Sequence, residues 1–157
     1  MENVKKIASF TVDHDCIGKG IYISRIDGDV TTYDLRTRRP NMGDYMDNLT
    51  MHSVEHMIAT YIRSSAIARD VLYFGPMGCQ TGFYLLVRGE NHARVREVLL
   101  EVLERTVNHE GDMFGASRKE CGNYKNLSLA AAKAECARYR EALLAQKNPF
   151  VYGGNAT

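Results

Sequence analysis

The sequence predicts an α+β domain, a largely antiparallel sheet packed by helices in a two-layer α/β sandwich. Segments of β-type composition come in groups joined by turn residues, and longer segments carry the 3.6-residue periodicity of helices. Strands that are grouped in hairpins, without strict alternation with helices, favour this class. The chain has 157 residues, of which 45% are hydrophobic and 25% charged, so we expect residues 1–157 to form a single domain with its own core.

The expected strands each carry a separate signal. Residues 7–14 alternate loosely between apolar and polar positions and predict the first strand. Two β-type runs within residues 20–36 flank Asp27-Gly28-Asp29, and Asp-Gly between such runs is a good hairpin signal. Residues 70–75 and 81–88 predict two further strands. Apolar residues on both faces of 81–88 indicate a covered, central strand.

Three segments predict helices. In residues 50–64 the apolar positions recur at helical spacing along one face. Residues 91–107 repeat this pattern, with Asn91 as a favourable N-cap. Ser128 is placed to cap an Ala-rich helix that ends near Gln146. We therefore expect these helices to pack against the sheet.

Composition excludes several classes of partner. A net charge of +1 and the lack of a dense Lys/Arg stripe predict no nucleic-acid partner. No apolar run reaches the roughly 18 to 20 residues that span a bilayer, so we expect no membrane association. Lys5 and Lys6 have no apolar stretch behind them, so a signal peptide is not expected. A cytoplasmic protein whose four cysteines are thiols follows from these observations.

The strongest local signal is the segment His52-Ser-Val-Glu55-His56. Residues four apart lie nearly one above the other on an α-helix, so the two imidazoles leave the same face with Glu55 beside them. Ala59 and Arg63 continue this face, while the apolar residues of the segment fall on the opposite side. Two neutral imidazoles at this spacing can bind one divalent ion.

Other interpretations of this segment are open. A histidine by itself is more often a hydrogen-bonded structural residue than a ligand, although the pair with its glutamate weakens that interpretation. H-x-x-E-H is also the inverted zinc-peptidase arrangement, in which a downstream glutamate supplies the third ligand and the motif glutamate activates water. A metal-stabilised binding module, with a closed coordination shell, is the alternative without enzymatic activity.

Two cysteines in glycine-containing loops favour a metal site. Cys121 lies within the irregular segment 108–127, and a thiolate is an excellent third ligand for a borderline metal. Cys79 lies within residues 76–82, Pro-Met-Gly-Cys-Gln-Thr-Gly, where glycines let the backbone approach a ligand closely. Spacing alone does not show that either loop meets the helix.

Several segments together resemble one family, the S-ribosylhomocysteine lyases or LuxS family. They are HSVEH, PMGCQTGFY and ECGNY, in this order and at these separations, with SFTVDH and YDLRTRRPN before them. The likeness covers nearly the whole chain, and PMGCQTGFY is highly specific. It implies one catalytic domain with a metal site of His52, His56 and Cys121, whose fourth position is open to water or substrate. Cys79 and Glu55 would be the proton-transfer pair.

The resemblance also implies cofactor, substrate and partner contacts. The ion would be Fe(II), with Zn(II) or Co(II) able to replace it. Ser9, His14 and Arg36 would contact the sugar part of the substrate, and Arg63 would lie close to the site. The family forms homodimers with active sites at the subunit interface, so we expect the same of this chain.

Two positions depart from the family pattern. Tyr73 stands six residues before Cys79, where the family commonly carries an acidic residue. Leu127 stands where many members carry histidine. Neither is an implied ligand or acid–base group, so the departures concern how the homocysteine end of the substrate is held.

The implied reaction splits S-ribosylhomocysteine into homocysteine and 4,5-dihydroxypentane-2,3-dione, an autoinducer precursor in quorum sensing. The thioether at ribose C5 is inert until a carbonyl has migrated from C1 to C3, after which β-elimination expels the thiolate. An open, three-ligand site fits this chemistry because a divalent ion stabilises negative charge that develops on oxygen, whereas a closed four-ligand site would be structural. A nearby cation would favour the Cys79 thiolate as the base.

Overall fold

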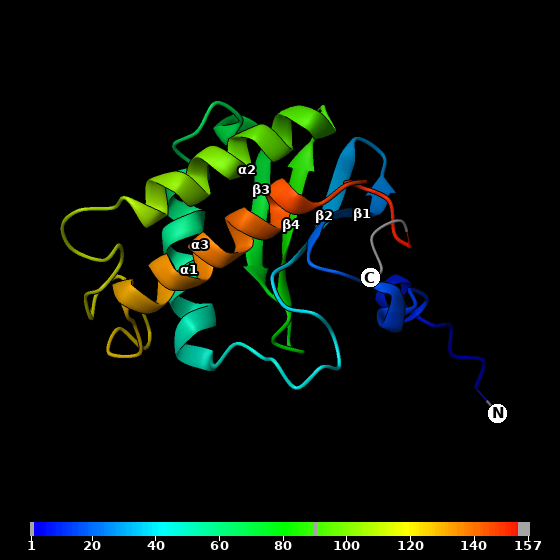
Figure 1. The fold of residues 1–157 in the computed structure, drawn as a ribbon, viewed down its shortest axis with the longest axis horizontal. Helices are drawn as coiled ribbons and strands as arrows, with labels where there is room; N and C mark the ends of the chain where they lie inside the picture. Colours follow the sequence, from blue (N-terminus) through cyan, green and yellow to red (C-terminus); the bar gives the residue numbers. More distant parts are fainter. Residues whose placement is uncertain (1, 90, 154–157) are drawn as a thin grey trace.

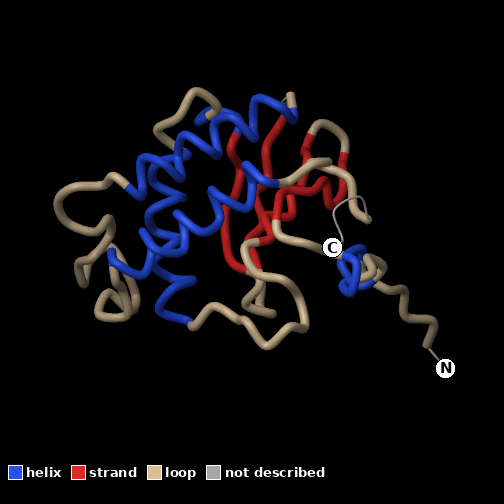
Figure 2. Tube along the Cα trace, viewed as in Figure 1, coloured by secondary structure: helices blue, strands red, loops and turns tan. Residues whose placement is uncertain are grey.

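The computed structural model describes residues 2–89 and 91–153 and confirms the two-layer α+β sandwich. Figure 1 shows three α-helices layered against one face of a sheet, and Figure 2 separates the helical and strand layers by colour. The sheet has the antiparallel order β1-β2-β4-β3. Its strands are β1 (Gly20–Asp27), β2 (Val30–Arg36), β3 (Val71–Pro76) and β4 (Gly82–Arg88). The helices are α1 (Asn48–Ile62), α2 (His92–Val107) and α3 (Leu129–Ala145).

The hairpin and the central strand are both confirmed. Asp27 pairs with Val30 at the end of the β1–β2 ladder, and Gly28 takes a left-handed φ of 60° in the turn. β4 lies between β2 and β3. The inward side chains of β2 and β4, such as Leu35 and Phe83, are buried beneath the helices. The two-residue period of a strand then sends the neighbouring side chains to the other face.

That other face, which we call the outer face, carries the polar residues of the sheet. Tyr22, Asp34, Tyr84 and Gly75 stand in one register row across the four strands. Tyr84 is half-buried rather than covered by a helix. The sheet is therefore apolar toward the helices and of mixed character on the outer face, where β2 presents the charged Asp34.

The predicted strand at residues 7–14 is wrong. This part of the chain instead forms two 3₁₀ turns, Ala8–Phe10 and His14–Cys16, outside the sheet. Side chains supply the reason, because the Thr11 hydroxyl donates to the Ala8 carbonyl and the Asp13 carboxylate accepts from the Asp15 N–H. Such local bonds satisfy the backbone within the segment and compete with strand pairing.

The helix that carries the two imidazoles forms as its periodicity predicts and begins slightly earlier. Val54, Met57, Ile58 and Ile62 are buried, while His52 and His56 are half-buried on the other side. The start is set by Asp47, whose carboxylate accepts a hydrogen bond of 2.7 Å from the Thr50 N–H.

Replacement of Asp47 by alanine should lower the free energy of unfolding by about 1 kcal/mol, because the first turn of α1 loses its cap. Hydrogen bonds from Thr50 hold the pKa of the Asp47 carboxyl below its ordinary value. The stabilisation is therefore present above the carboxyl's unfolded-state pKa and fades as the pH falls through the lowered folded-state pKa. Urea denaturation at neutral and acidic pH measures both effects. Asp47→Asn keeps a capping oxygen and should retain most of the stability.

Candidate active site

Three side chains that are distant in sequence converge on one point. His52 and His56 come from successive turns of α1, and Cys121 comes from the loop between α2 and α3. Their ligand atoms all lie within 4.8 Å of one another, and Cys121 Sγ is 3.4 Å from His52 Nε2. The two imidazole planes are nearly perpendicular, with ring centroids 4.6 Å apart. The loop thus does meet the helix, which spacing alone did not show.

Backbone carbonyls fix the orientation of both imidazoles. His52 Nδ1 donates to the Asn126 carbonyl at 2.8 Å, and His56 Nδ1 donates to the Phe114 carbonyl at 2.9 Å. Because a carbonyl only accepts, Nδ1 carries the proton in each ring and the Nε2 lone pair is free for a ligand. Both carbonyls belong to the same loop as Cys121, so one segment orients the whole group.

The loop approaches α1 closely at a glycine. Gly115 has a φ of +66°, and a Cβ at this position would lie 2.8 Å from His56 Nδ1. Only glycine fits a left-handed conformation against the imidazole. The backbone N–H of Asn123 also donates to Cys121 Sγ at 3.4 Å, which helps to orient the sulfur. Two neutral imidazoles and one thiolate form a donor set that suits a borderline divalent metal.

Glu55 lies beside the three ligand residues but is not one of them. It lines a cavity of about 250 Å³ together with His52, Pro76 and Asn123. Among the described residues, the group with metal-ligand spacing contains no carboxylate. Glu55 is half-buried and borders this cavity.

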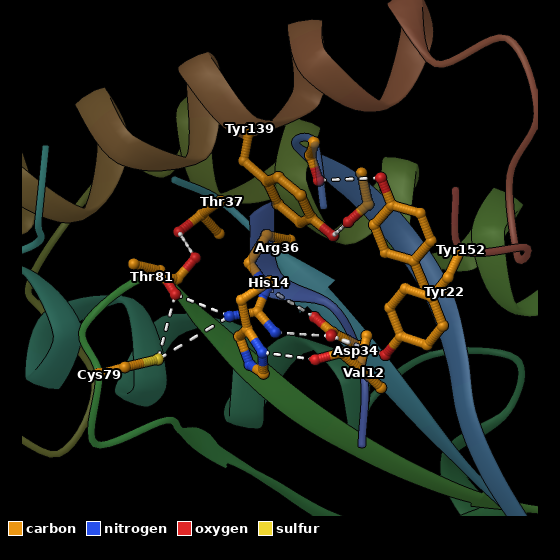
Figure 3. A network of polar contacts seen from close by, with 12 residues as sticks. Val12, His14, Tyr22, Asp34, Arg36, Thr37, Cys79, Thr81, Tyr139 and Tyr152 are labelled. Atoms are coloured by element: carbon orange, nitrogen blue, oxygen red, sulfur yellow. Dashed lines mark hydrogen bonds and ion pairs between the residues drawn. The ribbon is translucent and has the colours of Figure 1, made fainter. Parts of the chain in front are cut away.

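Cys79 belongs to a second cluster at the end of β2 and the start of β4 (Figure 3). Its Sγ lies 3.1 Å from Thr81 Oγ1 and 3.8 Å from Arg36 Nη1. Arg36 Nη1 also donates to Thr81 Oγ1 at 2.7 Å. On its other side Arg36 pairs with Asp34, as its place on the same strand face allows. A thiol and a guanidinium thus belong to one cluster of polar side chains.

The Asp34 carboxylate keeps Arg36 positively charged. Burial alone would lower the pKa of Arg36, but the Asp34 carboxylate outweighs it and leaves that pKa above its ordinary value. The pair is almost enclosed, with each side chain 3% exposed. A permanent cation therefore lies next to Cys79, where it can bind a negatively charged oxygen.

The loop that carries Cys79 is held in a strained conformation. Gln80 has a φ of 66°, which is unusual for a residue with a side chain. Two hydrogen bonds to Met46 hold it there, from the Gln80 side-chain amide to the Met46 carbonyl and from the Met46 N–H to the Gln80 carbonyl. The loop begins at Pro76, which lines the Glu55 cavity, so it joins the two clusters.

The remaining predicted residues occupy two different places. The Ser9 side chain hydrogen-bonds to the Tyr84 phenol on the outer face. His14 is half-buried, and its Nδ1 donates to the Val12 carbonyl at 2.8 Å (Figure 3). Arg63 lies exposed at the end of α1, with its guanidinium 3.4 Å from each of two β3 carbonyls. The substrate-binding role of these residues stays a prediction.

Sequence reasoning missed several members of the site. Thr81 bridges Cys79 and Arg36, and its position within the PMGCQTGFY motif was the available signal. The carbonyls of Phe114 and Asn126 have no sequence signal, because any residue has a carbonyl. The polar network behind Arg36 also includes a tyrosine near the end of the chain, Tyr152.

Fold and site together define a class: a small α+β protein in which one helix and one loop offer a His/His/Cys group for a divalent ion. The comparisons name the family. The model of the family described as S-Ribosylhomocysteinase (LuxS) matches residues 7–149, so the chain belongs to that family.

Curated relatives match most of the chain. The chain is 43% identical over 136 residues to S-ribosylhomocysteine lyase of Clostridium beijerinckii, covering 83% of this chain and 86% of the relative. It is 40% identical over 146 residues to the enzyme of the same name from Borreliella afzelii, covering 89% and 93%. The lyase of Phocaeicola vulgatus is 41% identical over 147 residues, covering 90% and 91%. These matches confirm the family resemblance of the motifs.

Proposed function

We propose that this chain is a carbon–sulfur lyase that cleaves S-ribosylhomocysteine to homocysteine and 4,5-dihydroxypentane-2,3-dione, the autoinducer precursor. The observation that carries the proposal is the convergence of His52, His56 and Cys121 within 4.8 Å in a chain of this family. The lyase names of relatives that match about nine-tenths of the chain support the substrate.

His52, His56 and Cys121 would hold the divalent ion through Nε2, Nε2 and Sγ. Three protein ligands fit an open catalytic site rather than a closed structural one. When bound, the ion acts as a Lewis acid that stabilises negative charge developing on the sugar oxygens. We propose Fe(II) as the ion, with Zn(II) or Co(II) as replacements, because the same donor set accepts all three.

The acid–base work falls to Cys79 and Glu55. A Cys79 thiolate next to the Arg36 cation would remove a C–H proton from the sugar and return it to the neighbouring carbon, which moves the carbonyl one position. Glu55 would carry protons on and off the oxygens. Once the carbonyl stands at C3, loss of the C4 proton expels the homocysteine thiolate from C5. Ser9, His14 and Arg36 would contact the sugar part of the substrate, and Arg63 would lie close to the site.

We propose that the active form is a homodimer with the active sites at its interface. The residues that line the cavity of Glu55 do not include Cys79, although the loop that begins at Pro76 connects the two clusters. Large hydrophobic side chains are exposed near the outer face, with Phe10 at 70% and Tyr73 at 52%. A second copy would cover them and close both clusters around one substrate. Size-exclusion chromatography with light scattering tests this state.

We also propose a cytoplasmic location, because the structure records four free cysteines, as a reducing compartment requires. Two of these thiols, Cys16 and Cys79, are exposed. Among the described residues, no helix combines the length and the apolar character needed to cross a bilayer.

A thiol assay with purified enzyme and S-ribosylhomocysteine tests the proposal. Release of one homocysteine per substrate, together with the dione, supports it. Hydrolysis of peptides without thiol release would instead favour the metallopeptidase hypothesis, which nothing in the ligand group supports because no carboxylate belongs to it.

Glu55→Gln should lower kcat by on the order of 10²–10⁴, the usual contribution of a general acid–base group. The amide keeps the shape of the side chain but cannot take a proton from a sugar oxygen. Bound metal, measured by elemental analysis, should stay near the wild-type level. Glu101→Gln, on the exposed face of α2, is the matched control and should leave kcat unchanged. A fully active Glu55→Gln enzyme would remove Glu55 from the mechanism.

A further inference from the structure

The Asp34–Arg36 ion pair has fixed geometry. Arg36 Nε donates to Asp34 Oδ1 at 3.0 Å, and Arg36 Nη2 donates to Asp34 Oδ2 at 2.7 Å. This two-point contact places the planar guanidinium in line with the carboxylate. The third nitrogen, Nη1, is then aimed at Thr81 and Cys79. The orientation of Asp34 therefore decides where Arg36 meets the site.

A residue from the other end of the chain also holds Asp34. The Tyr152 hydroxyl donates to Asp34 Oδ2 at 2.8 Å, and its ring stacks on Tyr22 with centroids 4.8 Å apart and planes within 9° (Figure 3). Oδ2 thus accepts from Tyr152 and from Arg36 at once. Burial, followed by the charge of Asp34, raises the pKa of Tyr152, so its hydroxyl keeps the proton that it donates.

The segment that brings Tyr152 to this place is anchored to β1. The N–H of Phe150 donates to the Ile21 carbonyl at 2.8 Å, and the N–H of Ile23 donates to the Phe150 carbonyl at 3.0 Å. Phe150 thereby forms a short parallel bridge opposite Tyr22. Gln146, just after α3, donates through its side-chain amide to the same Ile21 carbonyl at 3.2 Å. These bonds place the phenol of Tyr152 over Asp34.

We propose that Tyr152 is a positioning residue for the reaction: through Asp34 it holds Arg36 against Cys79 and Thr81. The inference rests on the proposed function, in which Arg36 binds the sugar and Cys79 moves its protons. Tyr152 itself contacts neither Cys79 nor Thr81 in the network of Figure 3. Without the Tyr152 hydroxyl, Asp34 keeps only its two bonds to Arg36, so the carboxylate and the guanidinium can turn together and away from Thr81 and Cys79.

The test is Tyr152→Phe, which keeps the ring stacked on Tyr22 and removes only the hydroxyl. The KM for S-ribosylhomocysteine should rise about tenfold, because Arg36 loses the fixed orientation in which it binds the sugar, while kcat changes less than threefold. Tyr139→Phe is the matched control. It also removes a buried hydroxyl, one that donates to the Gly20 carbonyl at 2.9 Å, and it should leave KM unchanged even where it lowers the melting temperature.

Two further measurements separate positioning from general stability. In an Arg36→Lys background, Tyr152→Phe should change KM by less than twofold, because its effect passes through Arg36; a full tenfold change there would overturn the proposal. The rate at which iodoacetamide alkylates Cys79, followed by peptide mass spectrometry on metal-loaded protein without substrate, should fall about threefold in Tyr152→Phe as the cation moves away. Unchanged KM and unchanged alkylation would also overturn it.

These outcomes remain distinct from failure of the proposed function. A wild-type protein that releases no homocysteine contradicts the lyase assignment, yet the alkylation rates still report whether Tyr152 controls the surroundings of Cys79. A wild-type protein that is active, with Tyr152→Phe identical to it in KM and alkylation, contradicts only the role of Tyr152.

Discussion

Cys79→Ala should lower kcat for homocysteine release by on the order of 10²–10⁴, because it removes the group proposed to take the C–H proton. Metal content should stay at the wild-type level, since Cys79 contacts Arg36 and Thr81 and is not among the ligand residues. The thiol assay measures the first effect and elemental analysis the second. The combination matters, because loss of activity together with loss of metal would make Cys79 a ligand.

The chain supplies a matched control in its other exposed thiol. Cys16 lies in the second 3₁₀ turn, and its Sγ contacts Asp13 Oδ2 at 3.4 Å. Neighbouring carboxylates, above all Asp13, raise the pKa of Cys16, the reverse of what a thiolate base requires. Cys16→Ala should keep kcat within twofold of the wild type. Normal turnover by Cys79→Ala would refute the proton-transfer role.

The elements of this fold that sequence could predict are those with a strong local pattern. In α1 the apolar residues at positions 54, 57, 58 and 62 are all buried, and the imidazoles leave the opposite side. The Asp-Gly turn and the caps at Asn91 and Ser128 also form as predicted, because each depends on bonds within a few residues. At residues 7–14 the loose alternation predicted a strand, but side-chain hydrogen bonds close 3₁₀ turns there instead.

In the candidate site, too, the residues with a local sequence pattern could be predicted and those placed by tertiary packing could not. The His52–Glu55–His56 face follows from helix geometry, but the arrival of Cys121 depends on a long irregular loop whose path has no periodic signal. Cys121 was predicted as the third ligand only through the resemblance to the family's motifs. The carbonyls that orient the imidazoles and the Tyr152 hydroxyl behind Asp34 could not be predicted, because they are set by tertiary packing between segments far apart in the chain.

Cys121→Ser should lose bound metal during purification and therefore lose activity. A serine hydroxyl is a hard, protonated donor at neutral pH, whereas a thiolate suits Fe(II), Zn(II) or Co(II). The remaining imidazoles, His52 and His56, supply two ligands, fewer than the three protein ligands of a stable catalytic site. We expect less than about a tenth of the wild-type metal per chain, measured by elemental analysis after anaerobic purification, which also identifies the metal that the wild-type protein carries.

Glu55→Gln is the control that makes this result specific. Glu55 lies on the same helix, between the two imidazoles and beside the same cavity, but outside the ligand group. Both variants should be inactive, yet only Cys121→Ser should be metal-poor. If Cys121→Ser kept a full equivalent of metal, the third ligand would have to come from elsewhere, as the inverted peptidase arrangement requires. The Cys121 sulfur lies 3.4 Å from His52 Nε2, close enough to share one ion with that imidazole. We therefore expect the protein to lose its bound metal when this sulfur is replaced.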